Sequence, residues 1–362
     1  MSKAADLANL IGNINAGGGG VNRNLIINGA QNVSQRHGTS SVQLSATEQY
    51  LTDRFFNDSG SSFDMKADAV QSTDAPSGFS NSLKLSCDGV SSLSSGSNGG
   101  ISQLIEGQNC QALAFGTSDA KPVTLSFYAK SSGTNSGHTY GIMLGAFLNG
   151  TRNIQTRGFT VTSSWQRFIM TFQPNSLVTS TGINDDNNNG IQVFFSLAAG
   201  SSDLQNYSVW TNSQSLSGFT GQDNFFDNTS NQFFLTGVQL EVGQNATTFE
   251  HEPFERTLEK CKRYFQVSGA INGYPMVRYE GTGNGKAYSN WRLIPEMRAT
   301  PTVSFSGTWT SSTGYAGTPT SGGKTNRQFR LLSASNVNQN DNLWVQTDSV
   351  TEFQGIESDA EL

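Results

Sequence analysis

Apolar and polar residues alternate along the middle of the chain in short runs, which are separated by loops of Gly, Ser, Thr and Asn. In residues 123–130 the odd positions are apolar, and the even positions are Thr, Ser, Tyr and Lys. Because successive side chains of a strand point to opposite faces, this run predicts a strand with one buried and one solvated face. The same pattern predicts strands at residues 83–87, 101–105, 142–148, 159–161, 166–172, 192–197 and 233–242.

The predicted strands follow one another without a helix of useful length, and their connections are long near residues 173–190 and 198–232. This organisation predicts a mainly β protein, whose largest part is a jelly-roll β-sandwich of two packed antiparallel sheets. Because aromatic residues in strands belong more often to the core than to a ligand platform, we expect Trp165 to be buried.

A helix is predicted after the sandwich. Pro253 suits a first helical turn, and apolar residues then recur at helical spacing, at Phe254, Leu258, Cys261 and Phe265. We therefore predict a connecting α-helix over residues 253–266, which follows a sandwich over residues 22–252. The remaining residues, 267–362, contain further strand patterns and are predicted to form a smaller C-terminal β domain.

A short amphipathic helix is predicted at the N-terminus. Its apolar face consists of four residues at helical spacing, Leu7, Leu10, Ile11 and Ile14. An isolated helix of this length is marginal in water and needs a partner surface, and the glycines at 17–20 supply a flexible tether. We therefore interpret residues 1–21 as an attachment helix and glycine linker. The alternative is an N-terminus that folds back on its own domain.

Composition narrows the class of protein. The chain has 362 residues, of which 39 are Gly and 14% are charged, as expected for a loop-rich β protein. A net charge of −6 without a basic stripe argues against nucleic-acid binding, and no stretch approaches the roughly twenty apolar residues of a membrane span. The cysteines, Cys87, Cys110 and Cys261, have no spacing typical of a disulfide framework or a zinc site.

Six stretches of the chain form a recognisable series, at residues 1–12, 22–30, 34–36, 259–265, 297–301 and 359–362. In the same order, and over nearly the whole chain, these stretches resemble a large group of bacteriophage tail fibres and minor virion structural proteins, including fibre proteins from phages of marine bacteria. His37 departs from the group's usual Gln-Arg-Gly pattern. Residues 127–130, 164–167 and 237–243 are similar to the carbohydrate-binding-module sandwich that these phage proteins share with some glycan-active enzymes.

The resemblance implies a virion structural protein, a tail fibre or short appendage, that is made in the host cytoplasm and assembled on the particle as a homotrimer. Its implied partners are other virion proteins of the tail or capsid at the N-terminus, and a host-surface glycan. Two alternatives stay open. One is a capsid decoration or knob protein, and the other is a spike enzyme that degrades polysaccharide.

No metal site or cofactor is predicted from motifs. Asp185, Asn187, Asn189 and Gly190 match the first half of an EF-hand loop, but Ser196 stands where the bidentate Glu is required, so we interpret the stretch as a polar loop. The resemblance to carbohydrate-binding sandwiches implies the alternative of a structural calcium near Asn28 and Glu241. The sequence also shows no selected pair of carboxylates and no nucleophile motif, so we expect a protein that is not an enzyme.

Aromatic residues are the candidate glycan-binding groups, because flat rings stack on sugar faces while amides and hydroxyls pair with sugar hydroxyls. Tyr207, Trp210 and Phe219 lie in the long polar segment 198–232. In the C-terminal domain, Trp309 and Tyr315 flank loop residues rich in Gly and Ser. We predict Trp309, Tyr315, Trp210 and Tyr207 as ligand-binding residues, with the first two in exposed loops.

Overall fold

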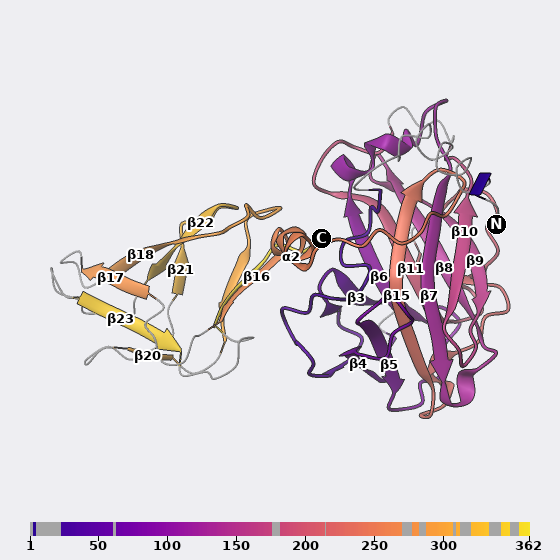
Figure 1. Ribbon diagram of the computed structural model, residues 1–362, viewed down its shortest axis with the longest axis horizontal. Coiled ribbons are helices and arrows are strands. Elements are labelled where there is room, and N and C mark those ends of the chain that lie inside the picture. The colour runs from indigo at the N-terminus through magenta and orange to yellow at the C-terminus, as the bar shows by residue number, and fades with distance from the viewer. Residues whose placement is uncertain are drawn as a thin grey trace. The chain divides into compact units, whose positions relative to one another are not determined.

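The computed structural model describes residues 3–4, 23–60, 63–175, 182–213, 215–269, 277–281, 287–306, 309–311, 320–332, 342–347 and 355–362. The chain divides into two compact units, residues 1–254 together with residue 362, and residues 255–361. Each unit has its own sheets (Figure 1). Each unit also has its own hydrophobic core. No helix among the described residues is long and apolar enough to cross a membrane.

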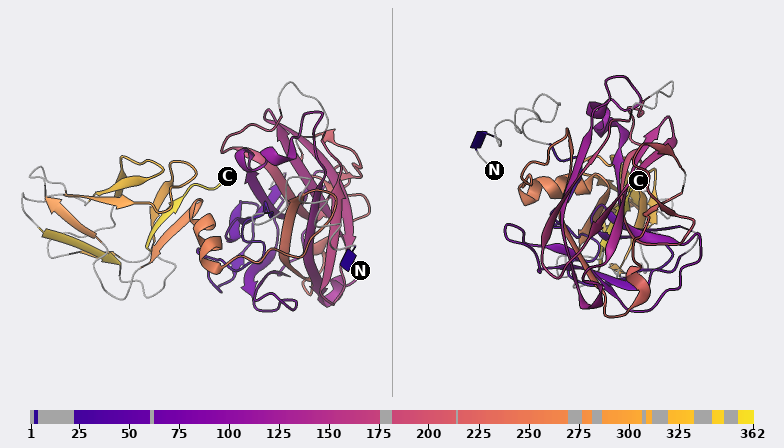
Figure 2. Two further views of the ribbon diagram at one scale, coloured as in Figure 1. Left: turned by 45° about the horizontal axis from the view of Figure 1, so that its top comes forward. Right: turned by 90° about the vertical axis from the view of Figure 1, so that its right-hand side faces the viewer.

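The first unit is a sandwich of two antiparallel sheets (Figures 1 and 2). Sheet A has the order β1 (Val42–Gln43), β4 (Ala67–Ser72), β5 (Ser82–Cys87), β15 (Gln232–Val242), β7 (Val123–Ser132) and β10 (Gln166–Phe172). Sheet B has the order β13 (Thr211–Asn212), β9 (Thr151–Thr160), β8 (Thr139–Leu148), β11 (Asn189–Ala199), β6 (Asn98–Glu106), β3 (Phe55–Gly60) and β2 (Gln49–Thr52).

The sandwich core lies between the two sheets and is rich in aromatic rings. Phe127 on β7 is fully buried, and its ring centroid lies 5.1 Å from Phe159 and 5.1 Å from Phe195. These rings meet nearly edge to face, which aromatic pairs favour over a flat stack. Both neighbours of Phe127 come from sheet B, so this residue ties the two layers together.

The predicted strands are confirmed, and the predicted mainly β sandwich is the observed fold class. The outer face of β7 differs in part from the prediction of a solvated face. Thr124 and Ser126 are buried because the chain after β15 runs over them. Thr124 donates to the carbonyl of Gly243 at 2.8 Å, and Arg167 donates to the carbonyl of Thr247.

The expectation that Trp165 is buried was wrong. The residue precedes β10, which is an edge strand of sheet A, and its side chain is half-buried. Its indole N–H donates to Asp74 Oδ1 at 3.1 Å, and Lys130 Nζ lies 5.4 Å from the ring centroid. Because the indole N–H of Trp165 needs a polar partner and finds it in the Asp74 carboxylate, the ring lies at the margin of the sheet and not in the core.

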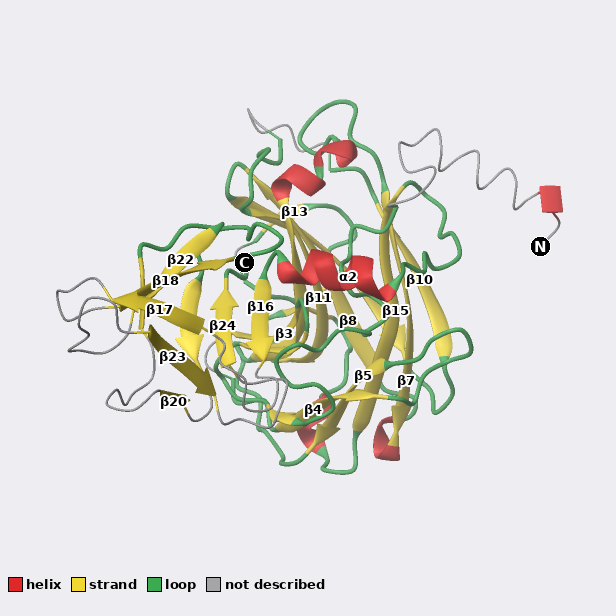
Figure 3. Ribbon diagram, turned by 60° about the vertical axis from the view of Figure 1, so that its left-hand side comes forward, coloured by secondary structure: helices red, strands yellow, loops and turns green. Residues whose placement is uncertain are grey.

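Short elements and loops complete the first unit. A parallel pair of two-residue strands, β12 (Leu204–Gln205) and β14 (Gly218–Phe219), lies within the long segment after β11. The 3-10 turns, which are red in Figure 3 together with the α-helix, are η2 (Gly107–Asn109), η3 (Gln111–Leu113), η4 (Gly133–Asn135) and η5 (Phe225–Asp227). The loop-rich composition is therefore realised as long connections between regular sheets.

The N-terminal stretch that carries the phage resemblance builds a buried polar cluster. Asn28 adopts a left-handed backbone conformation with φ of 60°, and its amide donates to the carbonyls of Val33 and Asp53. Asp53 in turn accepts from the backbone N–H of Gln35 at 2.7 Å and from the Gln35 side chain at 2.5 Å. The motif therefore holds the start of the sandwich in place rather than forming an open site.

The second unit begins with α2 (Phe254–Lys262), which is shorter than the predicted helix over 253–266. Phe265 was predicted on the helix, but it begins β16 (Phe265–Gly269), because pairing with β24 (Gly355–Asp359) extends the chain there. The apolar stripe also differs from the prediction. Phe254 is 51% exposed, whereas Thr257 and Cys261 are the buried helix residues.

The strands of the second unit form two sheets. One has the order β16, β24 and β19 (Thr302–Phe305). The other has the order β20 (Trp309–Ser311), β23 (Asn342–Thr347), β17 (Val277–Gly281), β18 (Ala287–Arg292), β22 (Gln328–Leu332) and β21 (Thr320–Gly322). Its described core is small and contains Leu293, Met297, Phe329, Leu331, Ile356 and Ala360. The predicted C-terminal β domain is therefore present, with few described apolar side chains in its interior.

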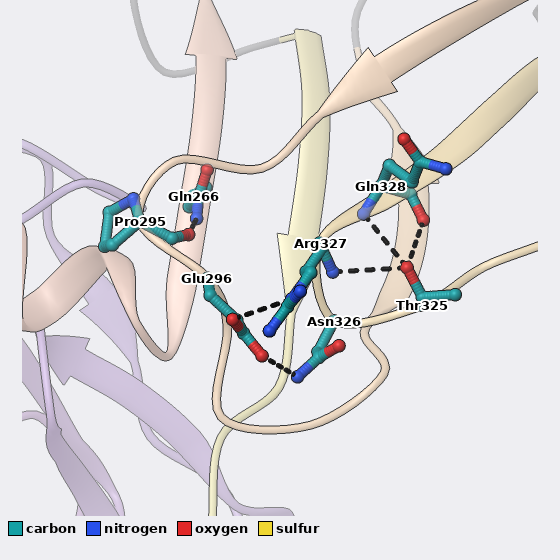
Figure 4. Close-up of polar contacts among 7 residues, drawn as sticks. All are labelled: Gln266, Pro295, Glu296, Thr325, Asn326, Arg327 and Gln328. Atoms are coloured by element: carbon teal, nitrogen blue, oxygen red, sulfur yellow. Dashed lines mark hydrogen bonds and ion pairs between the residues drawn. The ribbon is translucent and has the colours of Figure 1, made fainter.

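Polar contacts hold the loop before Met297 against the start of β22 (Figure 4). The Glu296 carboxylate accepts from Asn326 Nδ2 at 2.5 Å and from Arg327 Nε at 2.8 Å. Gln266 on β16 donates to the carbonyl of Pro295 at 2.8 Å. These contacts are exposed or half-buried and stabilise loops, so we assign them no ligand.

Candidate functional site

A groove of about 740 Å³ lies on the outer face of sheet B, the face turned away from sheet A. Its floor is formed by β9, β11 and β6, which contribute Arg152, Gln192 and Asn98. Ser59 and Gly60 at the end of β3 form one wall, and Leu216 with nearby residues of the segment after β11 forms the other. The volume is within the range of protein sites for small ligands.

The floor is a chain of hydrogen bonds across the sheet. Arg152 Nη1 donates to Gln192 Oε1 at 2.9 Å, and Gln192 Nε2 donates to Asp58 Oδ2 at 2.8 Å. Ser102 Oγ lies between the last two groups and donates to the same oxygen of Asp58 at 2.8 Å. Each side chain is therefore held by the next, and the groove is preorganised.

Strand register explains how these residues meet. Gln192 on β11 lies opposite Gly145 of β8, and Arg152 lies opposite Phe147, two positions farther along the same strand. A Cβ at position 145 would lie 3.3 Å from Arg152 Cδ and 3.5 Å from Gln192 Cβ. Glycine at this position therefore leaves room for the Arg152 side chain to cross β8 and reach Gln192.

A second polar limb borders the same groove. Asn98 accepts from the backbone N–H of Gly60 at 2.8 Å and donates to Asp203 Oδ2 at 2.8 Å. Asn98 therefore connects Gly60, at the end of β3, to Asp203, in the segment after β11. Because Asn98 is 3% exposed and both ends of its amide are engaged, the position of the Asp203 carboxylate is well defined.

Burial affects the ionisable groups of the groove. Burial raises the pKa of Asp58, while hydrogen bonds from Ser102 and Gln192 and the charge of Arg152 oppose the rise. Burial also lowers the pKa of Arg152, and the charge of Asp58 opposes that change. Polar groups held together at the floor of a cleft are a recognised signature of a binding site.

Apolar side chains complete the groove. Phe147 and Leu104 are half-buried and line it, so they offer apolar surface beside the polar floor. The Leu216 wall rests on a separate small core of Met143, Ile154, Phe194 and Leu216, against which Tyr207 packs. This core attaches the segment after β11 to the sheet.

Trp210, which we predicted as a ligand-binding residue, is buried in the structure. Trp210 is 7% exposed and packs edge-on against Phe115, with ring centroids 5.3 Å apart. Its indole N–H donates to the carbonyl of Gln173 at 2.6 Å. The ring therefore belongs to the sandwich core, because a backbone partner satisfies its polar atom inside the protein.

Tyr207 is half-buried, and Phe219 is half-buried against Gly158, where a Cβ would lie 2.5 Å from the Phe219 ring. Neither residue is among the described residues that line the groove. Trp309 lies on β20, but its side chain and all of Tyr315 fall outside the described residues. The predicted attachment residues, Leu7, Leu10, Ile11 and Ile14, also fall outside them.

The structure places residues of the half EF-hand match and of the calcium alternative in other contacts. Within the described ranges, no group of three or more His, Cys, Asp or Glu side chains could hold a metal ion. Asn189 and Gly190 begin β11 instead of forming a loop, and Asn28 is held in the Asp53 cluster. Glu241 accepts from the backbone N–H of Thr247 at 2.8 Å and from its hydroxyl at 2.8 Å.

The groove residues were not predicted, because the predicted glycan-binding groups were aromatic rings. A signal was present in the strands themselves. Asn98, Ser102 and Gln192 are polar residues at outward positions of central strands. Polar residues at such positions indicate that the outer face of the sheet is solvated or binds a polar ligand.

Comparison with known proteins gives only distant likenesses. No family model matches the sequence, and no curated protein matches it. The enzymatically active domain of tailspike protein 4 from bacteriophage CBA120 is 12% identical over 61% of this chain and 21% of that chain, with a TM-score of 0.31.

Two other solved structures are matched over nearly their whole length. A putative sugar binding protein from Bacteroides thetaiotaomicron is 11% identical over 60% of this chain and 99% of that chain, with a TM-score of 0.32. The family 11 carbohydrate-binding module of the Clostridium thermocellum cellulase Lic26A-Cel5E is 16% identical over 60% of this chain and 99% of that chain, with a TM-score of 0.29. At scores this low, the likenesses carry no argument about function.

Proposed function

We propose that the first unit binds an oligosaccharide in the groove of sheet B, and that it does so as part of a phage virion. The observation that carries the binding proposal is the fixed polar floor, in which Arg152, Gln192 and Asp58 are joined by hydrogen bonds across the sheet. A site of this kind is already ordered before a ligand arrives, so binding loses little side-chain entropy.

The chemistry of the groove suits a sugar. Each sugar hydroxyl both donates and accepts, and the groove offers carboxylate acceptors at Asp58 and Asp203 together with the amide of Asn189. Phe147 and Leu104 provide apolar surface for the C–H faces of a pyranose ring. A single sugar ring would leave much of the groove empty, so we expect the ligand to be an oligosaccharide.

The virion role rests on the sequence resemblance to phage tail fibres. In this proposal the chain is a tail fibre or short appendage that forms a homotrimer, docks by its N-terminal segment and contacts a host-surface glycan. Three copies would bind a repeating polymer with far higher avidity than one copy. We propose binding without cleavage, with capsid decoration as the alternative location.

The binding proposal is tested by probing a glycan array with the purified full chain, alongside Gln192→Ala and the matched control Gln166→Ala. Gln166 is an exposed residue of β10 on sheet A. We expect the wild type and the control to bind the same glycans and Gln192→Ala to lose them. Equal binding by all three proteins would exclude the groove, and release of reducing ends from a bound glycan would show an enzyme.

The virion proposal has a separate test. Gold-labelled antibody against the chain should decorate the tails of phage particles. Labelling of the head would favour the capsid alternative, and unlabelled particles that contain no copy of the chain would contradict a virion role.

A further inference from the structure

We infer that the groove selects an oligosaccharide without acidic groups and excludes acidic polysaccharides, an inference that rests on the proposed function and names its ligand class. The described residues that line the groove include three acidic side chains, Glu48, Asp58 and Asp203, and one basic side chain, Arg152. A ligand carboxylate or sulfate would therefore enter a site whose own charge is negative.

The Arg152 guanidinium is not placed as an anchor for anions. Its Nη1 donates to Gln192 Oε1 at 2.9 Å and its Nε donates to the carbonyl of Ser213 at 3.3 Å, and the residue is only 8% exposed. Recognition of a carboxylate by arginine usually uses two parallel N–H donors. A ligand anion would have to displace the existing partners, so Arg152 acts as a positioning residue for Gln192.

The charge balance holds for either protonation state of Asp58. Burial raises the pKa of this carboxyl, but with Asp58 neutral, Glu48 and Asp203 still outweigh Arg152. Asp203 is held in the groove by Asn98 Nδ2 at 2.8 Å, so its charge is at a fixed place. Repulsion of an acidic sugar is therefore a property of the folded groove and does not depend on a mobile surface charge.

Asp58 itself gives a cationic amino sugar little advantage. Asp58 Oδ2 already accepts from both Ser102 and Gln192, and the positive charge of Arg152 acts on the same carboxyl. A ligand ammonium beside Asp58 would be repelled by the Arg152 guanidinium. Hydroxyl groups can instead share the ordered acceptors and amides without bringing a charge into the groove.

The test compares one glycan in two charge states. A neutral oligosaccharide that binds in the array is oxidised at its primary hydroxyls to the uronate, and both forms are titrated into the full chain by calorimetry. We expect the oxidised form to bind about tenfold more weakly or worse at low salt. The difference should shrink as salt is raised, because salt screens charge repulsion.

Glu48→Gln provides the matched variant. Glu48 is an exposed residue at the rim, and its replacement keeps the shape of the side chain while removing a charge. We expect this variant to bind the oxidised form more tightly than the wild type does. Equal or tighter binding of the oxidised form by the wild type, or an array in which only acidic glycans bind, would overturn the inference while leaving glycan binding intact. Binding of no glycan would overturn the proposed function itself.

Discussion

Gln192 donates a hydrogen bond to Asp58 although their strands, β11 and β3, are separated in sheet B by β6. The two side chains meet above β6, where Ser102 donates to the same Asp58 oxygen. This contact places a half-buried carboxyl at the floor of an open groove and fixes its orientation. It is the arrangement on which the proposed binding site depends.

Removing the Gln192 amide should destabilise the protein as well as weaken binding. Gln192→Ala leaves Asp58 and Arg152 each with one partner fewer in a buried setting, so we expect a loss of about 1–3 kcal/mol in the free energy of unfolding. Urea titration measures this loss. Gln166→Ala should change stability by less than about 0.5 kcal/mol, because it alters an exposed side chain. Equal effects of the two substitutions would contradict the assigned network.

The ionisation of Asp58 should make stability depend on pH in a definite direction. Its pKa is raised in the folded state above the ordinary value of 3.8, so from about pH 4 upward, ionisation costs the folded state more than the unfolded state. Asp58→Asn removes this cost. Relative to the wild type, the variant should therefore become more stable as the pH rises from 4 through the folded pKa, as measured by thermal unfolding at several pH values.

Asp186 is the matched control with the opposite sign. Hydrogen bonds from the side chain and backbone of Asn188 lower the pKa of Asp186, so its contribution is present above pH 4 and is lost as the pH falls. The stability gap between Asp186→Asn and the wild type should stay constant from pH 4 to 7. An Asp58→Asn gap that is also constant over this range would show that Asp58 has an ordinary pKa.

Phe127 and Tyr128 should differ sharply in their effect on stability. Phe127 is fully buried among three other phenylalanine rings, and Phe127→Ala should cost about 3–5 kcal/mol. Tyr128 is half-buried on the other face of β7, where it contacts Phe79 with ring centroids 5.3 Å apart. Tyr128→Ala should cost clearly less. Similar midpoints for the two variants in a denaturant titration would argue against the alternation of this strand.

The N-terminal segment should be needed for assembly and not for folding. The glycines at 17–20 separate the predicted attachment helix from the sandwich, which begins its described structure at Arg23. A chain without residues 1–16 should unfold cooperatively at the wild-type temperature but should no longer copurify with virions. Incorporation of the shortened chain into particles at the normal level would contradict the attachment role.

The strands of the sandwich could be predicted because alternation is a local signal that each strand carries by itself. Residues 166–172 were predicted and are the observed β10, and the predicted strand at 233–242 is β15 with one further residue at its start. The end of α2 was missed because Phe265 leaves the helix to pair with Asp359, a partner that is distant in sequence. Local helical spacing contains no information about that pairing.

The groove could not be predicted for the same reason. Its residues come from strands far apart in the chain, and their meeting depends on register, which places Gly145 opposite Gln192. Trp210 was misassigned because a tryptophan in a polar segment has the same local pattern whether it faces solvent or packs on Phe115. Trp309 and Tyr315 stay predictions as ligand-binding residues.

The most direct measurement is a crystal structure of the full chain with an oligosaccharide identified on the array. The account predicts sugar rings in the groove of sheet B, with ring hydroxyls hydrogen-bonded to Asp58 and Asp203. It also predicts that the contact between Arg152 and Gln192 is preserved in the complex. Sugar bound elsewhere, for example against Trp309 and Tyr315 in the C-terminal unit with the groove filled only by water, would contradict the assignment of the groove as the binding site.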